Sequence, residues 1–254
     1  MTDNAEQRRN DIVRRIVAGG KVKVTDLSRL YGISEVSIRN DLELLETRGV
    51  ISRVHGGAVP VNKLYMNMNL NERFLSNASA KKALAQKAAE LVSDNDTIMM
   101  NAGTTLTYVL RALQCKKNLS IVTNSVQNAI EANNCAFNVI LLGGQMDPKY
   151  QFTHGQDTLR QLENYHAGKC ILSLDGISAS FGMTLYYPNE AAVIRKMMEL
   201  SGSVIVAADS SKIGRNTFSR VAPISGVQTL ITSAAANEEE LQGLRNAGIT
   251  VIEA

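Results

Sequence analysis

The chain has 254 residues, of which 44% are hydrophobic and 20% charged, and its formal net charge is +3. These proportions are typical of a globular protein with one large domain, or with a small and a medium one. No stretch approaches the ~20 consecutive apolar residues of a membrane-spanning helix, and the polar first ten residues lack the apolar core of a signal peptide. We therefore expect a cytoplasmic protein without a membrane partner. The net charge is too small to indicate nucleic-acid binding by itself.

The cysteines give no sign of a metal site. Cys115, Cys135 and Cys170 are far apart, and no Cys-x-x-Cys pair exists near which a histidine could complete a ligand set. Zinc sites and disulfide frameworks need clustered ligands or paired cysteines. We predict no metal and no cofactor, and small buried thiols in a reducing compartment.

The first fifty residues predict three short helices. Ile12, Val13 and Ile16 have helical spacing in a segment that starts after Asp3-Asn4 and ends at Gly19-Gly20. Residues 21–24 are expected to form an edge strand. A short helix then follows Thr25, with Leu27, Leu30 and Tyr31 on its inner side.

A further helix is expected after Gly32, with Ser34 as its N-cap and with Ile38, Leu42 and Leu45 buried before it stops at Gly49. Two short helices joined by a glycine-containing turn form a helix-turn-helix, whose second helix enters the major groove of DNA. Arginine and asparagine make paired hydrogen bonds to guanine and adenine respectively. The candidate DNA-binding residues of this helix are Ser34, Glu35, Ser37, Arg39 and Asn40.

Residues 50–59 predict a β-hairpin that turns at Gly56-Gly57. Such a hairpin would form a wing, from which Arg53 and His55 project toward the DNA backbone or the minor groove. The alternative is that the helices and hairpin form a protein-binding module, in which these polar side chains are an ordinary solvated surface.

The residues of this segment resemble the DNA-binding head of the DeoR family of regulators. The resemblance rests on residues 24–34, on Ser37-Ile38-Arg39-Asn40-Asp41-Leu42, and on Arg53-Val54-His55-Gly56-Gly57-Ala58. The family usually has a second arginine at the position of Asn40. We expect Asn40 to change which operator is chosen and not to abolish DNA binding.

The chain is expected to divide into a winged helix-turn-helix domain at residues 1–59, a linker at 60–79 and an α/β domain at 80–254. The linker shows no clear periodicity, and residues 71–73 would open the second domain. From Lys81 onward, helical stripes alternate with apolar strands near residues 97–100, 119–123, 139–142, 170–174, 204–208, 229–231 and 249–252. This alternation predicts a mostly parallel sheet covered by helices on both faces.

Ligands of parallel sheets bind beyond the carboxyl ends of the strands. Small, hydroxyl-bearing, amide and charged residues directly follow several predicted strands, and Gly103-Thr104-Thr105 opens a helix in the way that anion sites do. Lys212 could add positive charge, and Asp175 could accept hydrogen bonds from sugar hydroxyls. Ordinary turn chemistry explains one such group, but not five at one sheet edge. The candidate effector-binding residues are Asn101, Gly103, Thr104, Thr105, Asn124, Gly143, Gly144, Asp175, Gly176, Glu190 and Lys212.

Several of these segments also resemble the DeoR sensor domain, which is similar in fold to ribose-5-phosphate isomerase. They include Asp175-Gly176-Ile177, Asn189-Glu190-Ala191 and Ala208-Asp209-Ser210-Ser211-Lys212. The resemblance implies a repressor of carbohydrate genes that senses a phosphorylated sugar without catalysis. In two departures, Asn101 replaces a common aspartate and Ser173-Leu174 replaces a typical Gly-Ala.

Two other functions stay open from the residues alone. A sugar-phosphate isomerase or deaminase would use Asp175 or Glu190 as its base and Lys212 to hold the anion, but the head would then serve no purpose. An interaction module with a vestigial pocket is the third alternative. Our main hypothesis is a homo-oligomer, dimeric or tetrameric, that binds double-stranded operator DNA under control of the phosphorylated sugar.

Overall fold

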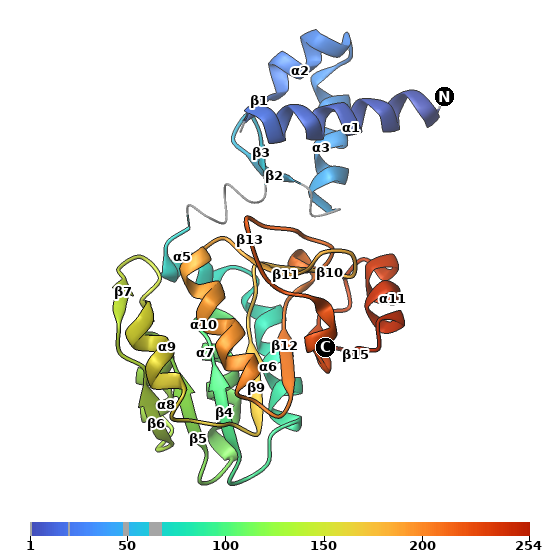
Figure 1. Ribbon diagram of the computed structural model, residues 1–254. Helices are drawn as coiled ribbons and strands as arrows, with labels where there is room; N and C mark the ends of the chain where they lie inside the picture. The colour runs from blue at the N-terminus through green and yellow to red at the C-terminus, as the bar shows by residue number, and fades with distance from the viewer. Residues whose placement is uncertain (1, 20, 48–50, 61–67) are drawn as a thin grey trace. The chain divides into compact units, whose positions relative to one another are not determined.

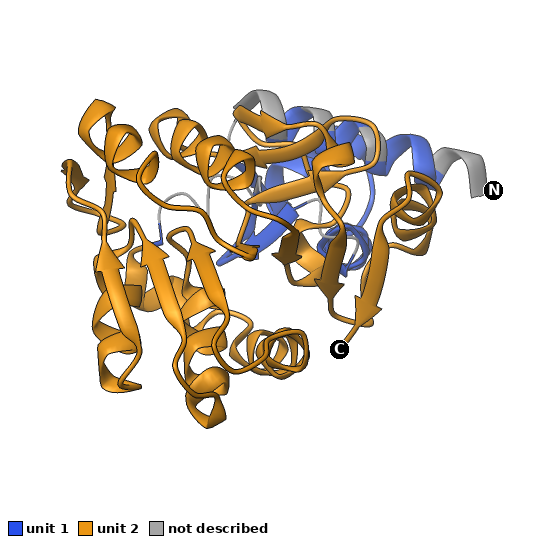
Figure 2. Ribbon diagram, turned by 60° about the horizontal axis from the view of Figure 1, so that its bottom comes forward, with its two compact units in different colours: residues 1–68 blue, residues 69–254 orange. Residues whose placement is uncertain are grey.

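The computed structural model describes residues 2–19, 21–47, 51–60 and 68–254. These residues fall into two compact units, residues 1–68 and 69–254, which Figure 2 colours separately. None of the helices in the described ranges is long and apolar enough to span a membrane. The predicted strands of the hairpin are described, whereas the end of the preceding helix at Gly49 lies outside the described residues.

Unit 1 is a winged helix-turn-helix. Its core is formed by the predicted stripes, with Ile12 and Ile16 of the first helix packed with Ile38 and Leu42 of the third. The three strands pair antiparallel in the order β1-β3-β2. The elements are α1 (Thr2–Gly19), β1 (Val22–Lys23), α2 (Val24–Tyr31), α3 (Glu35–Thr47), β2 (Ile51–Val54) and β3 (Gly57–Pro60).

Two details of α2 differ from the sequence expectation. The helix begins at Val24 instead of after Thr25, because Lys23 adopts the extended N-cap conformation. Leu30 was expected on the inner side but is 52% exposed. The buried stripe of α2 runs through Val24, Leu27 and Tyr31, spaced by three and four residues. Leu30 lies about 100° around the helix from Tyr31 and therefore falls outside this stripe.

Unit 2 is built on one sheet of seven parallel strands in the order β15-β14-β12-β9-β4-β5-β6 (Figure 1). Each strand lies within one or two residues of its predicted position. The strands are β4 (Thr97–Met100), β5 (Ser120–Thr123), β6 (Asn138–Leu141), β9 (Lys169–Leu172), β12 (Val204–Ala207), β14 (Thr229–Thr232) and β15 (Thr250–Glu253).

The two faces of this sheet have separate cores. Along β4, Ile98 and Met100 belong to one core and Met99 to the other, because successive side chains of a strand point to opposite faces. Helices α6 (Ala78–Glu90), α7 (Thr104–Ala112) and α8 (Val126–Asn134) contribute to the core of Ile98. Helices α9 (Gln156–Leu162), α10 (Pro188–Glu199) and α11 (Glu238–Asn246) contribute to the core of Met99. Helices thus cover both faces, as predicted.

The structure also contains shorter elements that were not predicted, because their strands of three or four residues are neither continuous apolar runs, like those of the parallel sheet, nor long enough to show alternation. Strands β7 (Gln145–Asp147) and β8 (Phe152–His154) form a hairpin after β6. A separate antiparallel sheet contains β10 (Gly176–Ser178), β11 (Gly182–Leu185) and β13 (Ser219–Ala222). Short 3-10 helices in the described part of the chain occupy Leu113–Cys115, Ser210–Lys212 and Ile224–Gly226.

The range predicted as a linker contains regular structure at its end. Helix α5 (Leu70–Leu75) begins with a capping box, in which Asn69 caps the backbone of Glu72 and Glu72 caps that of Asn69. A helix of six residues is too short to show apolar periodicity, and therefore only the Asn-x-x-Glu spacing could have revealed it. Residues 61–67 of the predicted linker lie outside the described residues.

Candidate DNA-binding surface and effector site

The recognition helix α3 starts as the sequence predicts. The Ser34 hydroxyl accepts a hydrogen bond from the main-chain N–H of Ser37 at 3.2 Å, the contact of an N-cap. Arg39 and Asn40 are exposed, while Glu35 and Ser37 are half-buried. Arg39 also donates to the carboxylate of Glu35 at 2.7 Å, one turn earlier on the helix.

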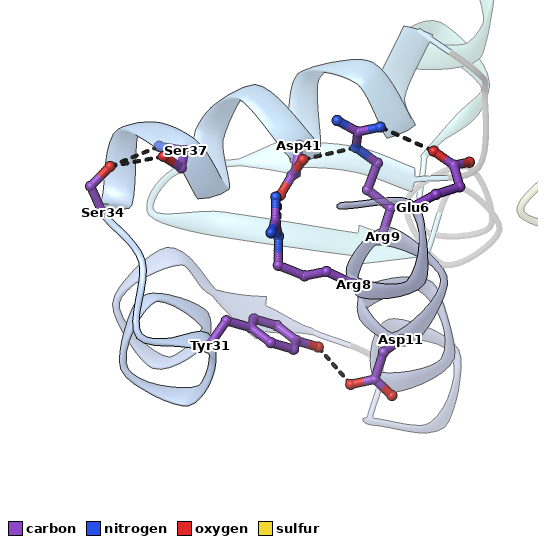
Figure 3. A network of polar contacts seen from close by, with 8 residues as sticks. All are labelled: Glu6, Arg8, Arg9, Asp11, Tyr31, Ser34, Ser37 and Asp41. Carbon is purple, nitrogen blue, oxygen red and sulfur yellow. Dashed lines mark hydrogen bonds and ion pairs between the residues drawn. The ribbon is translucent and has the colours of Figure 1, made fainter. Parts of the chain in front are cut away.

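A buried carboxylate attaches α3 to α1 (Figure 3). Asp41 is 2% exposed and accepts hydrogen bonds from Nε of Arg8 at 2.7 Å and from Nε of Arg9 at 2.8 Å. Asp41 is not among the site residues predicted from the sequence. Its signal was an acidic residue next to the apolar stripe of Ile38 and Leu42, opposite a helix with two arginines. The ion pairs fix the orientation in which α3 presents its exposed residues.

The recognition helix and the hairpin enclose a hollow of about 600 Å³. Three of the predicted DNA-binding residues line it, namely Arg39 from α3 and Arg53 and His55 from the hairpin. The other four predicted residues, Ser34, Glu35, Ser37 and Asn40, lie toward the start of α3 and do not line this hollow.

In unit 2, the sheet order places five strand ends side by side, those of β12, β9, β4, β5 and β6. Every predicted effector-binding residue except Glu190 follows one of these strands or opens the next helix. Glu190 comes from the first turn of α10. The cluster separates into a charged part at β12, β9 and β4 and an uncharged part at β5 and β6.

The charged part also contains two cations, Arg73 and Lys81, that were not among the predicted effector-binding residues. Arg73 of α5 lies 3.9 Å from the Asp175 carboxylate, measured from Nη1 to Oδ1. Lys81 of α6 donates from Nζ to the Thr104 hydroxyl at 3.1 Å and to the carbonyl of Arg73. Arg73 was noted in the sequence without a role, and Lys81 lies in an amphipathic helix where lysine is common. Only their burial in the fold distinguishes them.

The charged groups of this part are buried, and at three of them, Glu190, Lys81 and Lys212, burial shifts the pKa toward the neutral form. Burial raises the pKa of Glu190 from 4.5 to about 8, although the amide of Asn101 partly opposes the shift. Burial also lowers the pKa of Lys81 and of Lys212 from 10.5 to about 8. At both lysines, the negative charge of Asp209 is the main influence that opposes this lowering of the pKa. Clusters of perturbed groups of this kind are typical of functional sites.

Asn101 is used within the protein. Its Nδ2 donates to Oε1 of Glu190 at 3.0 Å and to the carbonyl of Ser173 at 3.1 Å, while its Oδ1 accepts from the N–H of Ser173 at 2.9 Å. The side chain therefore joins β4 to β9 and to α10. We expect Asn101 to orient Glu190 and not to contact an effector directly, which modifies the sequence prediction.

Two of the glycines predicted to bind the effector, Gly144 and Gly176, lie where neighbouring atoms leave no room for a side chain. A Cβ on Gly144, whose φ is +141°, would lie 2.2 Å from the Thr158 hydroxyl oxygen, and one on Gly176 would lie 2.3 Å from the Arg215 carbonyl oxygen. The N–H of Gly143 donates to Gln161 of α9 at 2.9 Å. Gly103 precedes α7 and Thr105 is buried in its first turn.

Asn124 presents a buried hydrogen-bond acceptor at the end of β5. Its Nδ2 donates to the carbonyl of Thr153 at 2.9 Å. Its Oδ1 is buried and accepts no hydrogen bond within the described part of the chain. A buried acceptor without a donor is costly, which favours a ligand hydroxyl at this position.

Aromatic side chains complete the charged part. Tyr150 belongs to the turn between β7 and β8, and the Arg73 guanidinium lies 4.2 Å from the centre of its ring. Tyr150 also packs on Tyr187, with the ring centres 4.6 Å apart. Arg215 donates to the Tyr186 hydroxyl. The predicted elements gave no indication of these contacts, because the short hairpins that bring them together were not predicted.

A winged helix-turn-helix joined to an α/β unit with a polar strand-end site defines the class of DNA-binding transcription regulators with a sensor domain. The family model described as the DeoR-like helix-turn-helix domain matches residues 8–63, and that of the DeoR C terminal sensor domain matches residues 76–234. The chain belongs to the DeoR family, as the sequence motifs predicted.

Relatives cover nearly the whole chain. The HTH-type transcriptional regulator YulB of Bacillus subtilis is 34% identical over 96% of this chain and 95% of its own. The lactose phosphotransferase system repressor of Streptococcus mutans is 32% identical over 94% of this chain and 96% of its own. The HTH-type transcriptional regulator GolR of Listeria innocua is 30% identical over 96% and 97%. Their names are those of regulators, which decides against the enzyme alternative.

Among solved structures, ribose 5 phosphate isomerase A from Neisseria gonorrhoeae is similar with a TM-score of 0.41 and 19% identity, covering 56% of this chain and 54% of its own. A transcriptional regulator from Streptococcus pneumoniae has a TM-score of 0.42 at 12% identity, covering 68% and 88%. Likenesses of this size are too slight to support an argument about function.

Proposed function

We propose that this protein is a repressor of carbohydrate genes whose operator affinity is controlled by a phosphorylated sugar bound at the strand ends of unit 2. The observation that carries the proposal is the charged part of the strand-end cluster. Arg73, Lys81 and Lys212 are each at most 8% exposed, which is rare for cations unless they serve a specific partner.

The chemistry of the cluster suits such a ligand. Lys81 lies beside Thr104, at the N-terminus of α7, where main-chain N–H groups and the helix dipole favour an anion. Asp175 and the unpartnered oxygen of Asn124 are acceptors suited to hydroxyl groups. A phosphorylated sugar accounts for both the charged and the uncharged part of the cluster, because its phosphate would be bound by the cations and its hydroxyl groups would donate hydrogen bonds to these acceptors.

In the head, we propose that Ser34, Glu35, Ser37, Arg39 and Asn40 read bases or adjacent phosphates and that Arg53 and His55 contact the backbone from the wing. Helix-turn-helix proteins usually bind two half-sites with two heads. We therefore propose a dimer or tetramer in which effector binding favours one arrangement of the heads over another.

The experiment is fluorescence anisotropy of the full chain on its own upstream DNA, with a panel of sugar phosphates added in turn. Two variants make the test specific to the site. Lys81→Met removes a buried cation, whereas Lys82→Met makes the same change at the adjacent exposed position. We expect both variants to bind DNA like the parent, and Lys81→Met alone to need at least ~10-fold more effector, because it loses a charge-assisted hydrogen bond.

Equal responses of the two variants would show that the effector binds elsewhere. If no sugar phosphate changes the DNA affinity of the parent chain, the proposed effector class is wrong even when operator binding is tight.

A further inference from the structure

A single carboxylate in the head holds the wing arginine at two points. Oε1 of Glu46, in the last turn of α3, accepts the main-chain N–H of Arg53 at 2.7 Å. Oε2 of the same side chain accepts Nε–H of Arg53, also at 2.7 Å. The recognition helix is thereby attached directly to the wing by its own side chain.

The position of Arg53 explains why this contact forms. Strand β2 is an edge strand, since the sheet order is β1-β3-β2 and β2 pairs only with β3 in the described sheet. Main-chain groups on the outer side of an edge strand have no strand partner. Glu46 supplies an acceptor for one of these N–H groups and uses its second oxygen to orient the side chain of the same residue.

Glu46 also lies where DNA should pass. It lines the hollow between α3 and the wing together with Arg39, Arg53 and His55, while Leu42 and Val24 form apolar wall. When α3 enters the major groove and the wing follows the backbone, phosphates pass close to this hollow. Glu46 is the one carboxylate among its lining residues.

A carboxylate at this place has two opposite effects on DNA binding. It repels phosphate and occupies part of the Arg53 guanidinium, so it weakens sequence-independent attraction to any DNA. It also restricts Arg53 to one orientation, so the arginine gains most from DNA whose backbone matches that orientation. The pair is exposed, with side-chain exposures of 42% for Arg53 and 38% for Glu46, so its own contribution to head stability is small.

We propose that Glu46 is a positioning residue that sets the ratio of operator binding to random-DNA binding by holding Arg53. The proposal concerns the head alone and does not depend on the identity of the effector. In this view, the acidic residue at the end of the recognition helix increases discrimination and lowers total affinity.

The test compares Glu46→Gln with Glu43→Gln in the full chain. Both changes remove one negative charge from α3, but Glu46 lines the hollow between α3 and the wing, whereas Glu43 does not. Anisotropy titrations on upstream DNA and on random DNA are run across a salt series. For Glu46→Gln we expect random-DNA binding to tighten by roughly threefold to tenfold at low salt, with a slope of log K against log salt steeper by about one phosphate contact. The affinity for the operator should rise less, so the ratio of operator binding to random-DNA binding falls.

A third variant separates charge from position. Glu46→Asp keeps the charge but is one methylene too short for both contacts, so we expect an unchanged salt slope and a lower operator-to-random ratio. Identical effects of Glu46→Gln and Glu43→Gln would overturn the proposal, as would equal tightening on both DNAs. If Glu46→Gln binds neither DNA, the test rests on Glu46→Asp. An operator-to-random binding ratio of Glu46→Asp as high as that of the parent would then overturn the proposal.

Discussion

Replacing Asp41 with asparagine should destabilise the head far more than a typical charge removal. Asp41 is buried and accepts two charge-assisted hydrogen bonds, from Arg8 at 2.7 Å and from Arg9 at 2.8 Å. Each such bond contributes about 1.5–3 kcal/mol. The arginine side chains are 20% and 23% exposed, so water replaces part of the loss, and asparagine keeps one weaker acceptor. We expect a net loss of about 2 kcal/mol.

This loss is large for a unit of this size. A domain of roughly 60 residues has a free energy of unfolding of about 3–9 kcal/mol. Its melting temperature shifts by about 4–8 °C for each kcal/mol, so Asp41→Asn should lower it by about 8–16 °C. The assay is scanning calorimetry of the full chain, in which the head transition is identified as the one that operator DNA raises.

The control is Glu35→Gln, which breaks the exposed pair with Arg39 on the same helix. Exposed pairs one turn apart contribute about 0.3–0.5 kcal/mol, so the control should shift the transition by less than about 4 °C. A shift for Asp41→Asn no greater than that of the control would refute the view that this carboxylate anchors the recognition helix.

Two further predictions concern the strand-end cluster. The pKa of Glu190 in the folded protein, about 8, lies above the ordinary glutamate value of 4.5. This group's contribution to the stability of unit 2 is therefore full below pH 4.5 and is lost as the pH rises through 8. Calorimetry between pH 5 and 8 should therefore show that the melting temperature of unit 2 falls more steeply with pH in the parent than in Glu190→Gln. Parallel pH dependences in the two proteins would contradict the raised pKa of Glu190. Asn101→Asp places a carboxylate against Glu190 and the Ser173 carbonyl, so it should lower the melting temperature of unit 2 more at pH 8 than at pH 5. A pH-independent effect would mean that the two side chains do not interact.

The sequence predicted the long-range arrangement of the sheet better than the local chemistry of the site. Strands of the parallel sheet are buried on both faces and read as apolar runs, and their carboxyl ends must meet at one edge. This is why Asp175 and Lys212 were placed together correctly. The partners Arg73 and Lys81 come from α5 and α6, outside the strand ends, and no periodicity distinguishes a buried cation from an exposed one.

The same limit applies to the head. Helical stripes located Ile38 and Leu42, but the pairs of Asp41 with α1 and of Glu46 with the wing depend on how the elements pack. Polar contacts between elements are set by side-chain directions in three dimensions, which residue spacing along one element does not contain. Asn101 illustrates the same limit, because its position at a strand end predicts ligand contact, whereas its hydrogen bonds to Ser173 and Glu190 depend on how β9 and α10 pack beside it.

The location of Arg73 bears on how an effector could act. It belongs to α5, the first described helix of unit 2, which begins three residues after the undescribed segment 61–67. Arg73 contacts Asp175 and Tyr150, so any ligand that competes for its guanidinium acts on the helix nearest in sequence to the head. A ligand changes an equilibrium only through different contacts in its two states. A cation on the first described helix of unit 2 is a group whose contacts can differ in this way, whereas the glycines beside β6 pack closely against α9.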